Sequence, residues 1–159
     1  MRFFLLPLTL FAFACSQPRQ EAEPAPAEAA QAAPITIADA WALPSPGGAS
    51  VAAGYMQIRA ADAGDRLIGA ASPRAASVEI HTMQTVDGVM QMRAVETLDI
   101  PANGSVALAQ GGNHLMFIGV TAPFAEGEDI PVELRFENAG VMAVTLPVRR
   151  PGAGGHEGH

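Results

Sequence analysis

The chain of 159 residues has one cysteine, no lysine and only 16% charged residues. Because Cys15 is the single cysteine, no disulfide can form within the chain. Nine arginines stand against 16 acidic residues, which gives a formal net charge of −7. Proteins bind nucleic acids through basic patches, so this shortage of positive charge argues against a nucleic-acid partner and suits a soluble protein partner.

The motifs of common enzyme sites are also missing from the sequence. No segment reads G-x-S-x-G, H-E-x-x-H or G-x-x-x-x-G-K-[ST]. The glycines near the C-terminus have no strand and helix around them to form a phosphate-binding loop, and Cys15 lies far from the region expected to fold. We therefore expect a binding protein and not an enzyme.

The first 14 residues have the features of a bacterial signal peptide. The apolar run Phe3–Ala14 follows Arg2, is too short to span a bilayer, and ends in small residues at Ala12 and Ala14. If Cys15 becomes the first mature residue it can carry lipid, and the segment then resembles a lipoprotein signal, although Ala12 stands where such signals usually have Leu. The alternative is ordinary cleavage after Ala14, which leaves a free thiol. Both alternatives predict export to the periplasm or cell envelope. Only the lipidated form would contact a membrane, through its lipid.

The rest of the chain divides by composition. Residues 15–34 are mostly Ala, Pro, Glu and Gln without apolar periodicity, which predicts a disordered tether, lipid-anchored or free. Residues 35–150 contain the Val, Ile, Thr and Phe of a folded domain, and residues 151–159 form a flexible Gly/His tail. We expect the protein to be a monomer.

Short β-rich runs alternate with turn residues throughout the domain, and no stretch keeps a helical period for three turns. Gly-containing turn signals such as Asp87-Gly88, Asn103-Gly104 and Gly111-Gly112 separate these runs. The spacing predicts an all-β fold, an antiparallel β-sandwich or Greek-key barrel. The expected strands are Thr36–Leu43, Ala53–Arg59, Arg66–Ser72, Ser77–Val86, Val89–Val95, Ser105–Leu108, Leu115–Val120, Ile130–Phe136 and Val141–Val148.

Three of these strands carry pairs of His or Met side chains at positions i and i+2. Such residues share one face of a strand, as in His81-Thr82-Met83, Met90-Gln91-Met92 and His114-Leu115-Met116. Asp87-Gly88 predicts a two-residue hairpin in which Met83 lies opposite Met92, and His81 is then diagonal to Met92. His114 and Met116 have to arrive from a neighbouring strand.

These donor types favour copper(I). Thioether and imidazole are soft to intermediate ligands, and Met, unlike paired thiolates, is not lost to a disulfide in an oxidising compartment. Structural zinc normally recruits Cys, and a blue-copper site needs a Cys thiolate that the expected domain lacks. Met56 and Met142 are interpreted as core filler, and Trp41 as a core or rim anchor.

The spacing of four of these residues, His81, Met92, His114 and Met116, resembles the H-x10-M-x21-H-x-M signature of the PCuAC periplasmic copper chaperones. Further segments similar to family landmarks are Ala53-Gly54-Tyr55-Met56, Asp65-Arg66-Leu67, Val89-Met90-Gln91-Met92-Arg93 and Gly112-Asn113-His114-Leu115-Met116. The resemblance implies a cupredoxin-like β-sandwich that binds one copper(I) through these four residues. It also implies delivery of the ion to the CuA site of cytochrome c oxidase, directly or through another copper chaperone.

Several alternatives remain at this point. Met83, and less readily Met90, could contact the metal or only pack beneath it. The tail residues His156 and His159 could bind copper(II) or be idle in solvent. For the whole protein, the alternatives to a chaperone are a copper-sequestering resistance protein without a dedicated acceptor and a structural surface lipoprotein that binds no metal.

Overall fold

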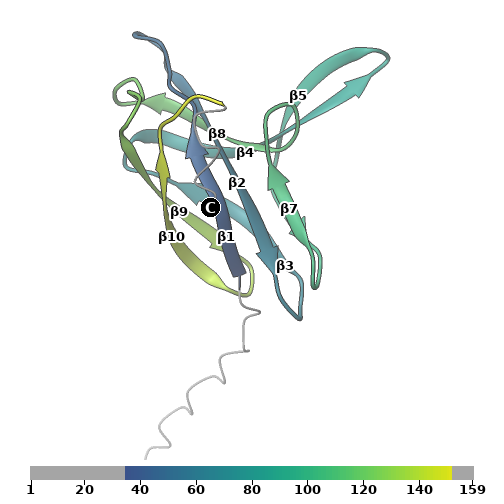
Figure 1. Cartoon of the computed structure of the whole chain (residues 1–159). Helices are drawn as coiled ribbons and strands as arrows, with labels where there is room; N and C mark the ends of the chain where they lie inside the picture. Colours follow the sequence, from purple (N-terminus) through teal and green to yellow (C-terminus); the bar gives the residue numbers. More distant parts are fainter. Residues whose placement is uncertain (1–34, 152–159) are drawn as a thin grey trace, which may run out of the picture.

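The computed structural model describes residues 35–151, and these form strands joined by turns (Figure 1). The predictions for residues 1–34 and 152–159, including Cys15, His156 and His159, lie outside the described residues. No helix capable of crossing a membrane is found in the described part. The strands are β1 (Ile35–Ala42), β2 (Val51–Ala60), β3 (Asp65–Ala71), β4 (Ala75–Val86), β5 (Val89–Val95), β6 (Leu98–Ile100), β7 (Ser105–Leu108), β8 (His114–Val120), β9 (Asp129–Phe136) and β10 (Gly140–Pro147).

The strands form one antiparallel sheet in the order β1-β2-β8-β4-β3-β9-β10, and β5, β6 and β7 pair with β4, β3 and β2 respectively. The last strand returns beside the first, where a bridge joins Ala42 to Val148 and the Arg149 amide donates to the Ala42 carbonyl. The sheet therefore curls into a nearly closed barrel or sandwich, which confirms the predicted all-β class.

The core is formed by one face of each main strand. In β9, Ile130, Val132, Leu134 and Phe136 are buried and alternate with exposed residues, as the two-residue period of a half-buried strand requires. Other strands contribute large side chains from the same inner face. The largest fully buried side chains of the core, which include Phe124 of the loop after β8 and Val148 just after β10, are Phe117, Phe124, Met56, Ile58, Leu67, Ile100, Leu115, Ile130, Leu134, Leu146, Val132 and Val148.

All nine predicted strands are present, with ends that shift by a few residues. The hairpin of β4 and β5 has the expected register, with Val86 opposite Val89 and Met83 opposite Met92. Both turn residues have positive φ, 53° at Asp87 and 78° at Gly88, as a type I′ turn requires. The tenth strand, β6, was not predicted because three residues before Pro101 are too few to show a period.

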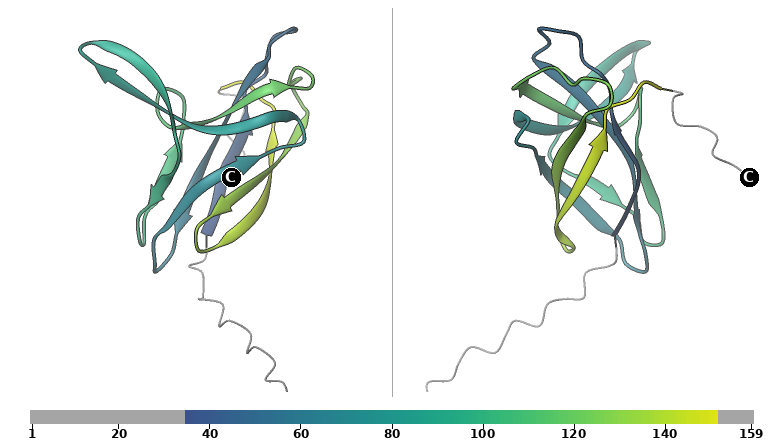
Figure 2. Two further views of the ribbon diagram at one scale, coloured as in Figure 1. Left: turned by 180° about the vertical axis from the view of Figure 1, so that it is seen from behind. Right: turned by 60° about the vertical axis from the view of Figure 1, so that its left-hand side comes forward.

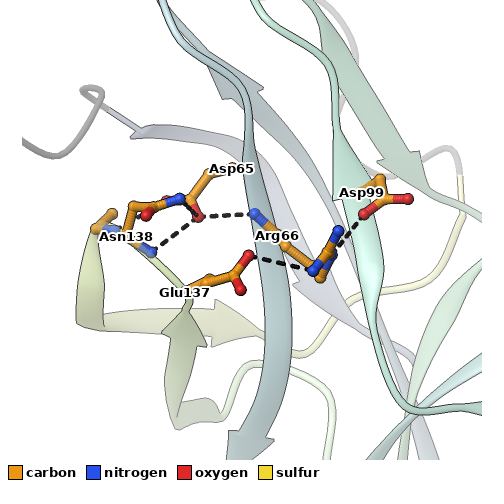
Figure 3. A network of polar contacts seen from close by, with 6 residues as sticks. Asp65, Arg66, Asp99, Glu137 and Asn138 are labelled. Atoms are coloured by element: carbon orange, nitrogen blue, oxygen red, sulfur yellow. Dashed lines mark hydrogen bonds and ion pairs between the residues drawn. The ribbon is translucent and has the colours of Figure 1, made fainter.

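A buried carboxylate ties the start of β3 to the turn between β9 and β10 (Figure 3). Asp65 accepts hydrogen bonds from the backbone amides of Arg66 at 2.7 Å, Asn138 at 3.0 Å and Ala139 at 2.9 Å, and from Asn138 Nδ2 at 3.2 Å. Burial raises the pKa of Asp65, but these hydrogen bonds to the charged form outweigh burial, so the net pKa lies below its usual range.

Replacing Asp65 by Ala is expected to destabilise the fold, because each buried donor left unpaired costs about 1–3 kcal/mol. The carboxylate's contribution should be complete above the unfolded pKa of about 3.9 and be lost as pH falls through the lower folded pKa. Urea unfolding of wild type and Asp65→Ala at pH 7 and pH 3 tests this. The gap between the two proteins should narrow at pH 3, and an unchanged gap would show that ionisation is not what stabilises this turn.

Candidate metal centre

Two histidines face each other on neighbouring strands. His81 of β4 lies directly opposite His114 of β8, with ring centroids 5.8 Å apart. Because Ile80 and Leu115, the adjacent residues of the two strands, are buried in the core, alternation turns both imidazoles to the outer face of the sheet. The strands thus join two residues that are 33 positions apart in the sequence.

His114 is buried although it lies on the outer face, with only 4% of the residue exposed. It is the first residue of β8, and the loop before it folds back so that Gly112 approaches the ring. A carbonyl can only accept, so His114 Nδ1–H donates to the Gly112 oxygen at 3.1 Å. This contact leaves the lone pair of His114 Nε2 for another partner.

His81 presents the opposite nitrogen. Its Nε2 lies 2.9 Å from Oε2 of Glu79, and because an ionised carboxylate only accepts, Nε2 carries the proton. Its Nδ1 is buried and has no hydrogen-bond partner within the described residues. A buried nitrogen without a partner is costly in a folded protein unless it binds a ligand. Of all the features of the structure, this nitrogen is therefore the best evidence that His81 binds a ligand.

The two candidate methionines lie on either side of this pair. Met116 is opposite Glu79 and Met92 is opposite Met83, so each methionine is diagonal to His81, at about 7–8 Å in a regular sheet and within reach of a long side chain. Met116 is half-buried, whereas Met92 is 47% exposed. Met83 shares the face of His81 and is half-buried as well.

Met92 is exposed because its hairpin leaves the body of the protein. Figure 1 and Figure 2 show β4 and β5 extending together beyond the other strands. The exposed large hydrophobic residues of the domain include four on this hairpin, Val86, Val89, Met90 and Met92. An exposed apolar group of this kind commonly marks an interaction site.

Aromatic side chains continue the row of the two histidines across the sheet. Tyr55 of β2 lies 6.5 Å from His114, and Trp41 of β1 lies 4.6 Å from Tyr55, measured between ring centroids. Burial raises the pKa of Tyr55, and a hydrogen bond from Gln110 offsets part of this rise, so the phenol beside the histidines stays neutral. Trp41 is thus at the rim of the site, separated from His114 by one ring.

A β-bulge in β1 places Trp41 on this face. Between the pairs Ala38–Gln57 and Trp41–Tyr55 the first strand has one more residue than the second, and Asp39 adopts φ 49° there. Without the extra residue, Trp41 would lie opposite Gly54 and point into the core. The sequence does not predict the bulge, because a bulge residue with positive φ is usually a glycine and position 39 is an aspartate. Without the bulge, the sequence does not predict the aromatic row either.

The structure brings together the His81 and His114 predicted as ligands and places Met92 and Met116 around them. Within residues 35–151, no three His, Cys, Asp or Glu side chains gather as a metal site. The contacts of Glu79 and Gly112 were not predicted from the sequence, although Glu79 stands at i−2 from His81 and so shares its face.

Comparisons with known proteins identify the family to which the chain belongs. The family model described as "Putative lipoprotein LpqE-like" matches residues 35–148. The putative lipoprotein Lxx21020 of Leifsonia xyli subsp. xyli (strain CTCB07) is 31% identical over 121 residues, which cover 75% of this chain and 72% of that protein.

Solved structures with the same fold include PCuAC domains. The copper-bound PCuAC domain from PmoF2 is 26% identical, with a TM-score of 0.63 over 76% of this chain and 96% of that one. The solution structure of CuI-DR1885 from Deinococcus radiodurans is 31% identical, with a TM-score of 0.61 over 77% of this chain and 83% of that one. The expected cupredoxin-like fold and the resemblance to PCuAC domains are thereby confirmed.

Proposed function

The chain belongs to the LpqE-like family of putative lipoproteins and has the fold of a PCuAC domain, and on this basis we propose that it is a copper(I) chaperone of the cell envelope. The observation that carries the proposal is the facing pair of His81 and His114, with the buried Nδ1 of His81, which has no hydrogen-bond partner among residues 35–151. Two similar solved structures, the copper-bound PCuAC domain from PmoF2 and CuI-DR1885, support copper as the ion.

We propose that one copper(I) is held by His81, Met92, His114 and Met116. Two neutral imidazoles and two thioethers suit a soft monovalent ion, and the thioethers need no deprotonation to bind. Copper is the cargo of this site, and the protein is proposed to carry it without catalysing a reaction. The His-rich tail, His156 and His159, is proposed as a separate weaker site for copper(II).

Transfer requires an acceptor to reach the ion while it is still bound. His114 is too buried to be approached directly, whereas Met92 is about half exposed on β5 of the projecting hairpin. We propose that the acceptor contacts the apolar hairpin around Met92 and Met90 and replaces Met92 first. A mixed-ligand intermediate of this kind avoids release of free copper.

The acceptor proposed is a copper-binding protein of the envelope, either the CuA subunit of cytochrome c oxidase or another copper chaperone. Export by the N-terminal segment, with or without a lipid on Cys15, would place the domain in the periplasm together with such acceptors. The chaperone is proposed to work as a monomer.

A copper(I) competition titration of the full chain under reducing conditions tests the site. All samples carry Cys15→Ser so that the thiol does not compete. Wild type should hold one tight equivalent, and Met92→Ala with Met116→Ala should weaken it by more than about 100-fold, since loss of outer-sphere partners alone costs about 10–100-fold. The control is Met142→Ala, which removes a methionine of β10 that is not among the proposed ligands.

Binding that is unchanged by the double substitution would show that these thioethers are not ligands. Absence of any tight equivalent in wild type would favour the structural lipoprotein. A chain that binds tightly but does not load an apo-CuA domain in the same buffer would instead be a copper-sequestering protein.

A further inference from the structure

Glu79 is placed to control how His81 presents itself to a ligand. It precedes His81 by two residues on β4, and its Oε2 lies 2.9 Å from His81 Nε2. The side chain of Glu79 is 44% exposed and that of His81 only 14%. Even as an ion pair, a contact to a carboxylate as exposed as that of Glu79 would add little to stability, so stability does not explain the contact.

The contact does determine which nitrogen of His81 is available. The neutral imidazole has one N–H and one lone pair, and an ionised carboxylate accepts only from the N–H. With the proton on Nε2, the lone pair is on Nδ1, the same atom that is buried without a partner in the described part of the chain. The available nitrogen is therefore the one shielded from solvent.

We propose that Glu79 is a positioning residue that holds His81 as the Nε2–H tautomer, so that the metal ion of the proposed function binds to His81 Nδ1. A carboxylate on the second nitrogen of a metal-binding histidine fixes the orientation of the ring and raises its basicity as a ligand. Glu79 is also directly opposite Met116, so it neighbours two of the proposed ligands without being one.

The other histidine is held in the opposite way. His114 donates from Nδ1 to the Gly112 carbonyl at 3.1 Å, which makes Nε2 its available nitrogen. The two imidazoles should therefore bind one ion through different atoms, His81 through Nδ1 and His114 through Nε2. A general effect of negative charge near the site would not assign a different metal-binding nitrogen to each histidine, so this difference separates the two explanations.

Long-range proton–nitrogen NMR of the full chain with ¹⁵N-labelled histidine measures both tautomers directly in the metal-free protein at neutral pH. Wild type should show His81 protonated on Nε2 and His114 on Nδ1. Glu79→Leu should shift His81 toward the Nδ1–H form and lower copper(I) affinity by about 10–100-fold, whereas Glu79→Gln, whose amide oxygen can still accept, should lose less. Glu133→Leu, an exposed site on β9, controls for loss of one negative charge.

Three results would overturn the proposal. They are a wild-type His81 protonated on Nδ1, an unchanged tautomer in Glu79→Leu, and an affinity loss as large in Glu133→Leu. Because the tautomer is measured without metal, it tests the role of Glu79 separately. If copper did not bind to wild type, the proposed function would fail while the Glu79–His81 contact would still be judged by the spectrum.

Discussion

Replacing His114 by Ala is expected to lower copper(I) affinity by more than about 100-fold, beyond the 10–100-fold range typical of losing a group that only supports a ligand. His114 is the most buried of the four proposed ligands, and its ring is fixed by the Gly112 carbonyl. Within residues 35–151 it is the one histidine besides His81, so no other imidazole there can take its place. The competition titration used for the methionines measures the effect.

Single loss of Met92 should have a smaller effect than loss of His114. Met83 lies directly opposite Met92, and Met90 is on the same face of the hairpin, so another thioether can approach the ion.

For His114, a loss of affinity of less than tenfold in His114→Ala would contradict the role of this residue as a ligand. Because His114 is buried and its replacement by Ala could disturb folding, His114→Asn should be tested in parallel. The fluorescence of Trp41, the single Trp in the chain, shows whether each variant is folded.

Much of the fold could be predicted because the local signals agree with one another. The strand expected at Ile130–Phe136 and the Asp87-Gly88 turn depend on short-range signals, and the structure confirms both. The hairpin register expected from this turn puts Met92 diagonal to His81, and the observed pairing agrees. The turn fixes the register of a hairpin, so these positions needed only the sequence.

The long-range part of the site could not be predicted in the same way. The pairing of β4 with β8, which brings His81 opposite His114, joins strands that no turn connects. The family signature implied that the two residues meet, but their spacing does not determine the geometry. The β-bulge at Asp39 was equally hidden, and with it the place of Trp41 beside Tyr55.

The structure also separates roles that residue types alone leave open. Met92 and Met116 have the same side chain, but one is exposed on a projecting hairpin and the other is half-buried two residues from His114. Of the two histidines, one is held by a carboxylate and the other by a backbone carbonyl. These differences arise from neighbours in space, and they give the proposed release to an acceptor a physical direction, from the Met92 side of the site.

Replacing Phe117 by Ala should lower the free energy of unfolding by about 3–5 kcal/mol, the usual cost of removing a fully buried Phe. The ring is fully buried and packs edge-on against Phe124 at 5.2 Å between centroids. It also fills the space above Gly54, where a Cβ would lie 2.9 Å from Phe117 Cε2. Urea unfolding measures the loss, and Val141→Ala, at an exposed position on β10, should change stability by less than about 0.5 kcal/mol.

Phe117 also tests whether the core determines the geometry of the site. It lies on the inner face of β8, and its neighbour Met116 and the nearby His114 are on the outer face of the same strand. If the backbone of β8 keeps its place, the variant should be less stable but bind one copper(I) with an affinity within about tenfold of wild type, since it keeps all four ligands. Copper should then raise the melting temperature of both proteins, because a ligand that binds only the folded state stabilises it by mass action. A folded variant that no longer binds copper would show instead that packing beneath β8 holds the ligands in position.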